Sequence, residues 1–295
     1  MSKTNEQVFE WSKPPSREND LSVKTYQIIK EKLEQKFWFD VDIFLQWSYS
    51  NSTNIKKDSD IDIVICYKKT YFFDISNLSE TDKKKYNQNK VPATYKFSQF
   101  KDDVENYLIS IFWKQVERKN KCIKINWKWI RVDADIVPCF PHKRYSSYNI
   151  VSAEWIQLIS DKWESIISFP KQHKENWERK NQQTNENYKG FVRIIKNCKK
   201  NLVDNNKIND NLVSSFLLEC LIWNLPNTIF TKNNSYKECL NEIIWTLYDD
   251  MWNSDKTNEY AEVCDLFYLF RWQRSKSTPL DVKNFLEEVY NLINN

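Results

Sequence analysis

Two short segments in which aspartate alternates with apolar residues constrain this chain more than any other feature of its sequence. In the first, Asp60 and Asp62 alternate with isoleucines, and apolar residues continue to Ile65. A period of two places both carboxylates on one face of a strand and the isoleucines on the other. An apolar run of this kind is typical of a strand buried inside a sheet. Residues 61–67 are therefore predicted to form a core strand that begins with an acidic pair.

The second segment, residues 130–138, repeats this alternation and carries Asp133 and Asp135 on one face. Neighbouring carboxylates repel each other, and burial increases the cost, so a cation is expected between them. Hard carboxylate oxygens suit Mg²⁺ or Mn²⁺. Three carboxylates from two neighbouring strands indicate a two-metal site for phosphoryl or nucleotidyl transfer. A solvated strand edge would explain one isolated D-x-D pair, but it accounts poorly for two such segments.

A serine-containing turn precedes the first acidic pair. Residues 41–45 have the composition of a strand, and Ser48 and Tyr49 follow it at the start of a turn. Backbone N–H groups and a hydroxyl in such a turn can hold a phosphate. The order of strand, serine turn, polar loop and acidic strand therefore favours a phosphate-containing substrate.

The stretch SYSNSTNIKKDSDIDIVI followed by VDADIVPCF resembles the polymerase-β-like nucleotidyltransferases. It is most similar to the bacterial cGAS/DncV-like enzymes, which make cyclic oligonucleotide signals in anti-phage defence. Their pattern is Gly-Ser, a polar loop with a threonine and a basic residue, S-D-x-D, and then a strand reading roughly D-x-x-P. The match implies that Asp60, Asp62 and Asp135 are the catalytic, metal-binding acids and that Ser48 contacts phosphate. The stretches WSKPPS, YKGFVRIIKN and SSFLLECLIWNLPN extend the resemblance over most of the chain.

The resemblance implies an α+β fold in which a polymerase-β-like sheet lobe packs on a helical lobe, with the active site in the cleft. We expect the catalytic lobe, with its N-terminal helix, at residues 1–183 and the helical lobe at 184–295. It also implies two Mg²⁺ or Mn²⁺ ions and NTP substrates. The products would be cyclic di- or trinucleotides that act on a separate downstream effector.

Further substrate contacts are implied for the helical half. In animal relatives of the family, a lysine and a serine from equivalent helices hold the donor triphosphate, and the following aromatic stacks on a base. The local match makes Lys196, Ser215 and Phe216 the candidates, with Arg193 as a substitute for the lysine. A lysine would act as a point charge on the phosphate oxygens. The alternative interpretations are that Lys196 is an ordinary surface lysine and that Phe216 is an aromatic residue of the core.

Composition narrows the other classes of function. The net charge is only +4, so general nucleic-acid binding is not implied. No apolar run approaches the roughly 20 residues of a membrane span, and the polar start does not resemble a signal peptide. Seven cysteines without a C-x-x-C pair and two histidines indicate a reduced, cytoplasmic protein without a structural zinc site.

The remaining pattern supports an α+β chain, because strands dominate the first half and helices the second. Residues 70–94 are polar and are expected to form an inserted loop, and residues 160–181 are expected to form a polar link. Helices are predicted at 19–37, 98–120, 187–202, 214–223, 235–251, 257–270 and 279–293. Strands are predicted at 41–45, 61–67, 122–126, 130–138 and 148–158.

The chain departs from the family pattern at one position, because Trp47 stands where the motif has glycine before Ser48. The chain holds one glycine and 13 tryptophans, whereas average usage predicts roughly 20 glycines. Several tryptophans also stand in turns that suit glycine, namely Trp127, Trp129, Trp163 and Trp177. Our hypothesis is that the source organism reads UGA as glycine and that the gene was translated as if UGA meant tryptophan. The alternative is a tryptophan-rich protein that has lost its glycines.

Two rival functions share the same acids. A nucleotidyltransferase that acts on RNA or protein would need a basic groove or a macromolecular acceptor, and the near-neutral charge speaks against it. A catalytically impaired nucleotide-binding relative is favoured if Trp47 is genuine. The expected enzyme needs neither an obligatory nucleic acid nor a membrane.

We predict that Trp47→Gly raises NTP turnover by at least about a hundredfold. An indole brings roughly 150–250 Å² of surface into a position meant for no side chain, and each ~1.4 kcal/mol of lost transition-state stabilisation costs tenfold in rate. Steady-state kinetics on the two proteins measure the effect. If Trp47→Gly neither binds NTP better nor turns it over faster, the impaired-relative interpretation takes precedence.

Overall fold

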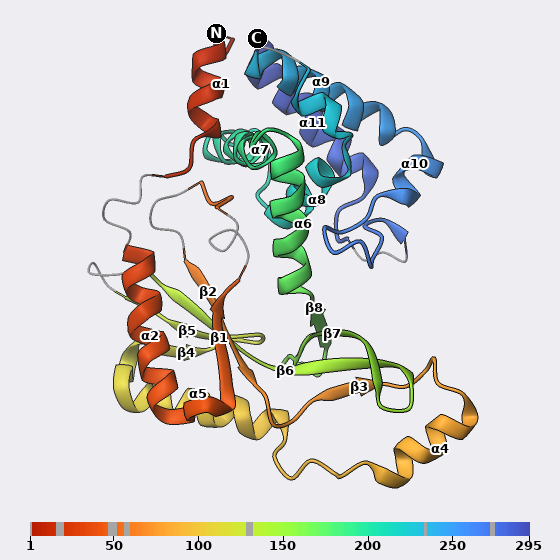
Figure 1. Cartoon of the computed structure of the whole chain (residues 1–295). Coiled ribbons are helices and arrows are strands. Elements are labelled where there is room, and N and C mark those ends of the chain that lie inside the picture. Colours follow the sequence, from red (N-terminus) through yellow and green to blue (C-terminus); the bar gives the residue numbers. More distant parts are fainter. Residues whose placement is uncertain are drawn as a thin grey trace. The chain divides into compact units, whose positions relative to one another are not determined.

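The computed structural model of the chain describes residues 2–15, 21–46, 52–55, 60–127, 132–232, 235–271 and 275–295 (Figure 1). The chain divides into two compact units. The sheet unit comprises residues 16–50 and 57–171, and the helical unit comprises residues 1–15, 51–56 and 172–295. This grouping differs from the expected division at residue 184, because the N-terminal residues and residues 172–183 belong with the helical unit. The short segment 51–56 also belongs there.

The described part of the sheet unit contains one mixed sheet of eight strands. Its main order is β1 (Val41–Leu45), β2 (Ile61–Tyr67), β6 (Ala134–Ser147), β5 (Ile123–Ile125) and β4 (Val116–Arg118). Strands β2 and β6 run parallel, and the other neighbours in this order are antiparallel. Beyond that region the long β6 pairs with β3 (Phe72–Asp74) and β7 (Ile150–Ile159), and β7 pairs with β8 (Ser165–Ser168). This sheet is the scaffold of the aspartates.

Helices α2 (Leu21–Phe37) and α5 (Phe97–Phe112) pack on this sheet through residues with helical spacing. Buried residues on α2 include Ile29 and Leu33, and those on α5 include Phe100, Val104 and Leu108. Because β2 is apolar on both faces apart from its acidic start, its isoleucines are completely buried under these helices. The apolar side of the acidic strand is therefore fixed in the core.

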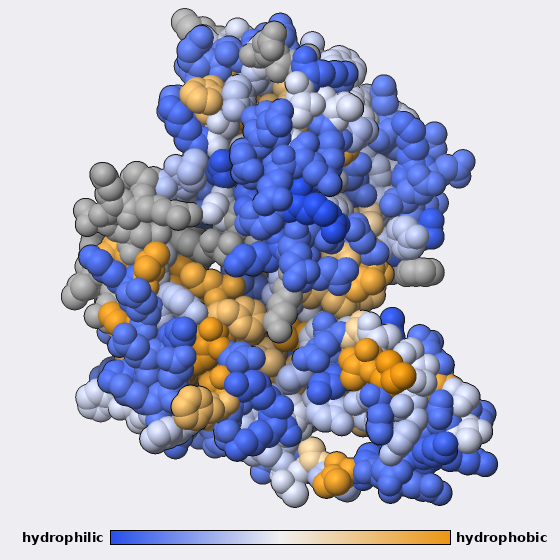
Figure 2. Space-filling model, viewed as in Figure 1, coloured by the Kyte–Doolittle hydropathy of each residue, from blue (hydrophilic) through white to orange (hydrophobic). Residues whose placement is uncertain are grey.

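The helical unit contains α1 (Asn5–Ser12), α6 (Pro170–Gln183), α7 (Tyr188–Asp204), α8 (Ser215–Asn224), α9 (Tyr236–Asp250), α10 (Ser254–Glu259) and α11 (Pro279–Asn294). Helix α7 is buried along almost its whole length and forms the centre of the core of this unit. Helix α6 is amphipathic: it buries His173, Asn176 and Trp177 and exposes Lys174 and Glu175. Figure 2 shows the resulting hydrophilic surface over α6.

Strands 41–45 and 61–67 have the predicted bounds, and the prediction of an α+β fold is confirmed. The predicted loop at 70–94 is wrong, because it contains β3 and α4 (Glu80–Asn89). Helix α4 is nearly all polar, so its sequence has no periodic apolar signal. Ser79, a typical N-cap residue whose hydroxyl accepts a hydrogen bond from the amide of Asp82, was the available signal. Its one buried residue, Tyr86, packs on Tyr145.

Other boundaries also differ from the predictions. Helix α5 ends at Phe112 instead of continuing to residue 120, because the backbone of Trp113 turns to positive φ. The predicted link 160–181 includes β8 and most of α6, and the predicted helix 257–270 is wrong. Between α10 and Phe270 the described chain is irregular apart from an isolated bridge between Ala261 and Tyr268.

The four turn tryptophans have different outcomes. Trp163 has a φ of 66°, as predicted for a position that suits glycine. Trp177 instead lies in α6 and is buried. Trp127 has no positive φ and is partly buried against Phe112, and the residues that follow it in the predicted turn lie outside the described ranges. Trp47 and Trp129 lie outside the described residues.

Within the described ranges, no helix has the combination of length and apolar character that crossing a bilayer requires. All seven cysteines are free thiols.

Candidate active site

The register between β2 and β6 brings two of the predicted acids together. Asp62 lies directly opposite Asp135 on the neighbouring parallel strand. Asp60 immediately precedes β2, and the two-residue period of a strand directs its side chain to the same face as that of Asp62. The three aspartates that the sequence singled out therefore lie together where β2 and β6 begin.

Burial and mutual repulsion disturb the titration of this group. Burial, followed by the charges of Asp135 and Asp60, raises the pKa of Asp62 to about 7. Burial also raises the pKa of Asp135. The Oδ1 atom of Asp135 is buried and has no hydrogen-bond partner among the described residues. A buried acceptor without a donor, next to a carboxylate that repels it, fits a divalent cation with hard oxygen ligands.

A lysine that the sequence analysis did not single out lies in the same group. Lys124 is on β5, paired in register with Asp135. Its Nζ atom lies 2.8 Å from Oδ2 of Asp60 and 3.3 Å from Oδ2 of Asp133. The hydrogen bond to Asp60 is the main cause of a raised pKa for Lys124. The alternation Ile123-Lys124-Ile125 was the available signal, because it places the lysine on the polar face of a strand.

Asp133 differs from Asp135 in that both of its carboxylate oxygens have a partner. Its Oδ1 accepts a hydrogen bond from the backbone N–H of Trp127 at 2.7 Å, and its Oδ2 faces Lys124. These contacts hold Asp133 against Lys124 of β5 and against Trp127. Asp135 is therefore the better supported of the two as a metal ligand.

The helical unit contains the other predicted residues. Lys196 on α7 is buried and forms an ion pair with Glu219 on α8. Its Nζ also donates to the backbone carbonyl of Thr53 at 3.1 Å, and Thr53 Oγ1 donates to Oε1 of Glu219 at 3.2 Å. Lys196 is thus an internal residue that anchors the segment 52–55, not the surface lysine of the alternative interpretation. Arg193 is similarly buried and donates to the carbonyls of Ser12 and Ser52.

Ser215 and Phe216 begin helix α8. Ser215 is exposed, whereas the neighbouring Ser214 is the N-cap and accepts a hydrogen bond from the amide of Leu217. Phe216 is partly buried and stacks on His173, with ring centroids 5.8 Å apart. Ser48 lies outside the described residues.

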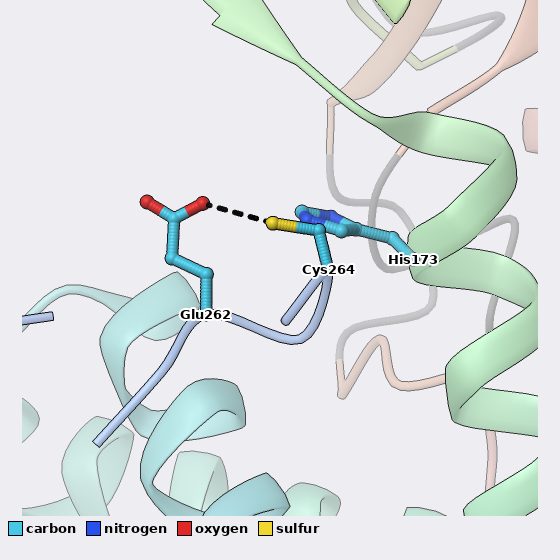
Figure 3. A group of neighbouring side chains, drawn as sticks. All are labelled: His173, Glu262 and Cys264. Atoms are coloured by element: carbon cyan, nitrogen blue, oxygen red, sulfur yellow. Dashed lines mark hydrogen bonds between the residues drawn. The ribbon is translucent and has the colours of Figure 1, made fainter. Parts of the chain in front are cut away.

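A separate polar group lies in the helical unit, where His173 meets Glu262 and Cys264 (Figure 3). All three residues are buried, and the thiol of Cys264 donates to Oε2 of Glu262 at 3.7 Å. Burial raises the pKa of Cys264 to about 12, so the thiol stays protonated and acts as a donor. The sequence contains no motif that predicts this group, because His173 is remote in sequence from the other two residues.

Comparisons with known proteins find relatives that match this chain over nearly its whole length. The family model of the cGAS/DncV-like nucleotidyltransferase C-terminal helical domain matches residues 175–294. The chain is 42% identical to a cyclic dipurine nucleotide synthase from Elizabethkingia meningoseptica, over 99% of each protein. It is 33% identical to a cyclic dipyrimidine nucleotide synthase from Cecembia lonarensis, over 98% of this chain and 97% of that protein.

Solved structures of cyclic dinucleotide synthases are also similar to this chain over nearly its whole length. A cyclic dinucleotide synthase from Elizabethkingia meningoseptica, solved with GTP and Apcpp, superposes with a TM-score of 0.83 at 38% identity and covers 99% of this chain and 100% of its own. A cyclic UMP-AMP synthase from Rhodothermus marinus, solved with Apcpp and Upnpp, gives a TM-score of 0.84 at 26% identity, over 98% and 96% of the two chains.

We predict that Asp62→Asn stabilises the metal-free protein at pH 8. The folded-state pKa of about 7 exceeds the unfolded value of about 3.9, so the folded protein binds this proton more tightly and wild-type stability falls as the pH rises from about 4 to about 7. Asparagine removes this penalty, so the variant should gain up to about 4 kcal/mol at pH 8 and little near pH 4.

Urea unfolding in EDTA at pH 5 and pH 8 measures the difference between the two proteins. A variant that is less stable than wild type at pH 8 would show that the carboxylates do not repel each other in the folded protein.

Proposed function

This chain belongs to the cGAS/DncV-like nucleotidyltransferase family, and from that membership we propose that it joins two NTPs into a cyclic dinucleotide. The observation that carries the proposal is the register of Asp62 against Asp135, with Asp60 one alternation away. The full-length similarity to a cyclic dipurine nucleotide synthase supports it. The product would act on a separate effector in anti-phage defence, in the cytoplasm.

The reaction would consist of two nucleotidyl transfers. In each, a ribose hydroxyl oxygen attacks an α-phosphorus, the bond from phosphorus to the pyrophosphate oxygen breaks, and pyrophosphate leaves. The hydroxyl proton passes to a base. The second transfer closes the ring, so each cyclic dinucleotide releases two pyrophosphates.

Asp60, Asp62 and Asp135 would hold two Mg²⁺ or Mn²⁺ ions. Such ions lower the pKa of the attacking hydroxyl and neutralise the triphosphate. The buried Oδ1 of Asp135 has no hydrogen-bond partner in the described part of the chain, and Asp135 would orient the attacking hydroxyl and help to remove its proton. The partial burial of Asp62 would place the reacting phosphate in a less polar environment than bulk water, where electrostatic interactions are stronger.

Substrate contacts would come from Ser48 to phosphate, from Lys196 and Ser215 to the donor triphosphate, and from Phe216 to a base. For Lys196 this role requires an exchange of partners, because its ammonium is now bonded to Glu219 and Thr53. Ser215 needs no such exchange, because it is exposed at the start of α8.

The rival that acts on RNA or protein shares the same acids but requires a macromolecular acceptor. The net charge of +4 gives little attraction for a polyanion, and this favours small NTP substrates.

We predict that the purified protein converts NTPs alone, with Mg²⁺, into a product that resists phosphatase. The assay uses the four NTPs singly and in pairs, with chromatography and mass analysis, in the written chain and in the Trp47→Gly variant. Asp135→Ala should abolish the product, because it removes a metal-binding carboxylate. Asp42→Ala is the matched control: Asp42 is an exposed aspartate on the adjacent strand β1, and this variant should retain activity.

Product that appears only after RNA or a protein acceptor is added would support the rival function. Wild-type turnover in Asp135→Ala would remove Asp135 from the site and make Asp133 the replacement candidate.

A further inference from the structure

Lys124 occupies a position that a divalent cation would contest. Its ammonium bridges Asp60 and Asp133, and its backbone pairs with that of Asp135. Four carboxylates, those of Asp60, Asp62, Asp133 and Asp135, alternate along the starts of β2 and β6 on one face of the sheet. Among the described residues, Lys124 is the cation paired with this group.

The bridge is held from both sides. The Lys124 side chain is 22% exposed, so most of its stem is covered, while the Asp60 side chain is 55% exposed. Asp133 is in turn fixed by the amide of Trp127. Asp133 therefore keeps the Lys124 ammonium beside Asp60. Asp60 is consequently the carboxylate for which a metal ion would compete with Lys124.

We infer that Lys124 is a resident cation of the acidic site, one that competes with a divalent metal ion for Asp60 and so keeps the site weak for free metal. The inference rests on the proposed two-metal site. A metal ion that takes Asp60 must displace the ammonium or accept its repulsion. An ion that arrives with a triphosphate brings negative charge with it, and the displaced ammonium then has a partner. Lys124 would thus couple metal binding to nucleotide binding.

The test measures Mn²⁺ affinity without nucleotide, by electron paramagnetic resonance of the free ion, in wild type, Lys124→Met and Lys124→Gln. Both variants should bind Mn²⁺ at least about tenfold more tightly, because the competing charge is gone. A non-hydrolysable NTP should narrow this difference. Lys119→Met is the matched control: Lys119 lies in the adjoining β4–β5 turn and its ammonium pairs with Glu117, so the Mn²⁺ affinity of this variant should equal that of wild type.

The outcomes separate the two proposals. Equal or weaker Mn²⁺ binding in folded Lys124 variants overturns the role of Lys124 and leaves the metal site intact. Asp135→Ala should reduce Mn²⁺ binding at least about tenfold, and if it does not, the proposed metal site itself fails. Circular dichroism identifies any variant that has not folded, and the second Lys124 substitution then decides.

A second inference comes from backbone angles. Nine non-glycine residues in the described part of the chain have positive φ, and three of them are tryptophans: Trp38, Trp113 and Trp163. Ten of the 13 tryptophans are described, all but Trp47, Trp129 and Trp272. Only a few per cent of non-glycine residues have positive φ, and bulky residues are rare among them. Three in ten is therefore far above expectation.

Each of the three positions has a geometry that glycine serves. Trp38 directly follows α2 with a φ of 52°, where a helix commonly ends on a left-handed glycine. Trp113 caps α5 with a φ of 49° and a ψ of −118°, outside the left-handed region that side chains tolerate. Trp163 closes the turn between β7 and β8, where its N–H donates to the carbonyl of Ser160.

The indoles at these positions contribute little packing. They are 71%, 74% and 84% exposed, more than any other tryptophan described. Conversely, the one glycine, Gly190, lies within α7, has no positive φ, and packs against Ser12. Three positive-φ positions of the described chain therefore hold tryptophan, while the one glycine lies in a close helix contact.

We propose that glycine is the native residue at positions 38, 113 and 163. Single Trp→Gly substitutions at these positions should raise the melting temperature, and the triple variant should exceed each of them. Trp245→Gly is the matched control, since Trp245 is half exposed but lies within α9 and packs on Tyr290, so glycine there should lower the melting temperature.

Scanning calorimetry of the five variants gives the comparison, and peptide mass analysis of the protein from its own organism identifies the residues directly. Tryptophan in the native peptides, or a triple variant less stable than the written chain, overturns the proposal.

Discussion

The central constraint on the sheet unit is that its apolar core holds two repelling carboxylates, Asp62 and Asp135, in register across the parallel pair β2 and β6. Two carboxylates in register are unfavourable in the folded state, and burial makes them more so. The isoleucines and valines between them are completely or nearly completely buried under α2 and α5, so the strands cannot slip to separate the acids. The free energy gained by burying the apolar core thus maintains an acidic pair that is itself unfavourable.

In the helical unit a buried carboxylate is neutralised by protein groups alone. Glu219 and Lys196 are both buried, and their ion pair is completed by Thr53 from the segment 52–55. Removing one partner of such a pair leaves a buried charge, which costs about 3–5 kcal/mol. The segment 52–55 is therefore anchored to α7 and α8 through Thr53. In the acidic site, by contrast, Lys124 neutralises only part of the charge.

The tryptophans show how backbone geometry reveals a residue that composition only suggests. The scarcity of glycine predicted displaced glycines, but the polar turns around Trp163 and Trp177 look alike in sequence. Only the former has positive φ, while the latter lies in a helix and is buried. Trp38 and Trp113 were not singled out, because a helix end is visible in a sequence only when its cap is typical.

The sequence by itself determined the α+β class, the two acidic strands and the three proposed acids, because a two-residue period and a buried apolar run leave little freedom in a strand. The contacts between residues that are distant in the chain were determined only by the tertiary structure. Lys124 meets Asp60 across 64 positions, and Lys196 meets Thr53 across 143. No local pattern records such pairs, since they arise when strand order and helix packing bring separate segments together.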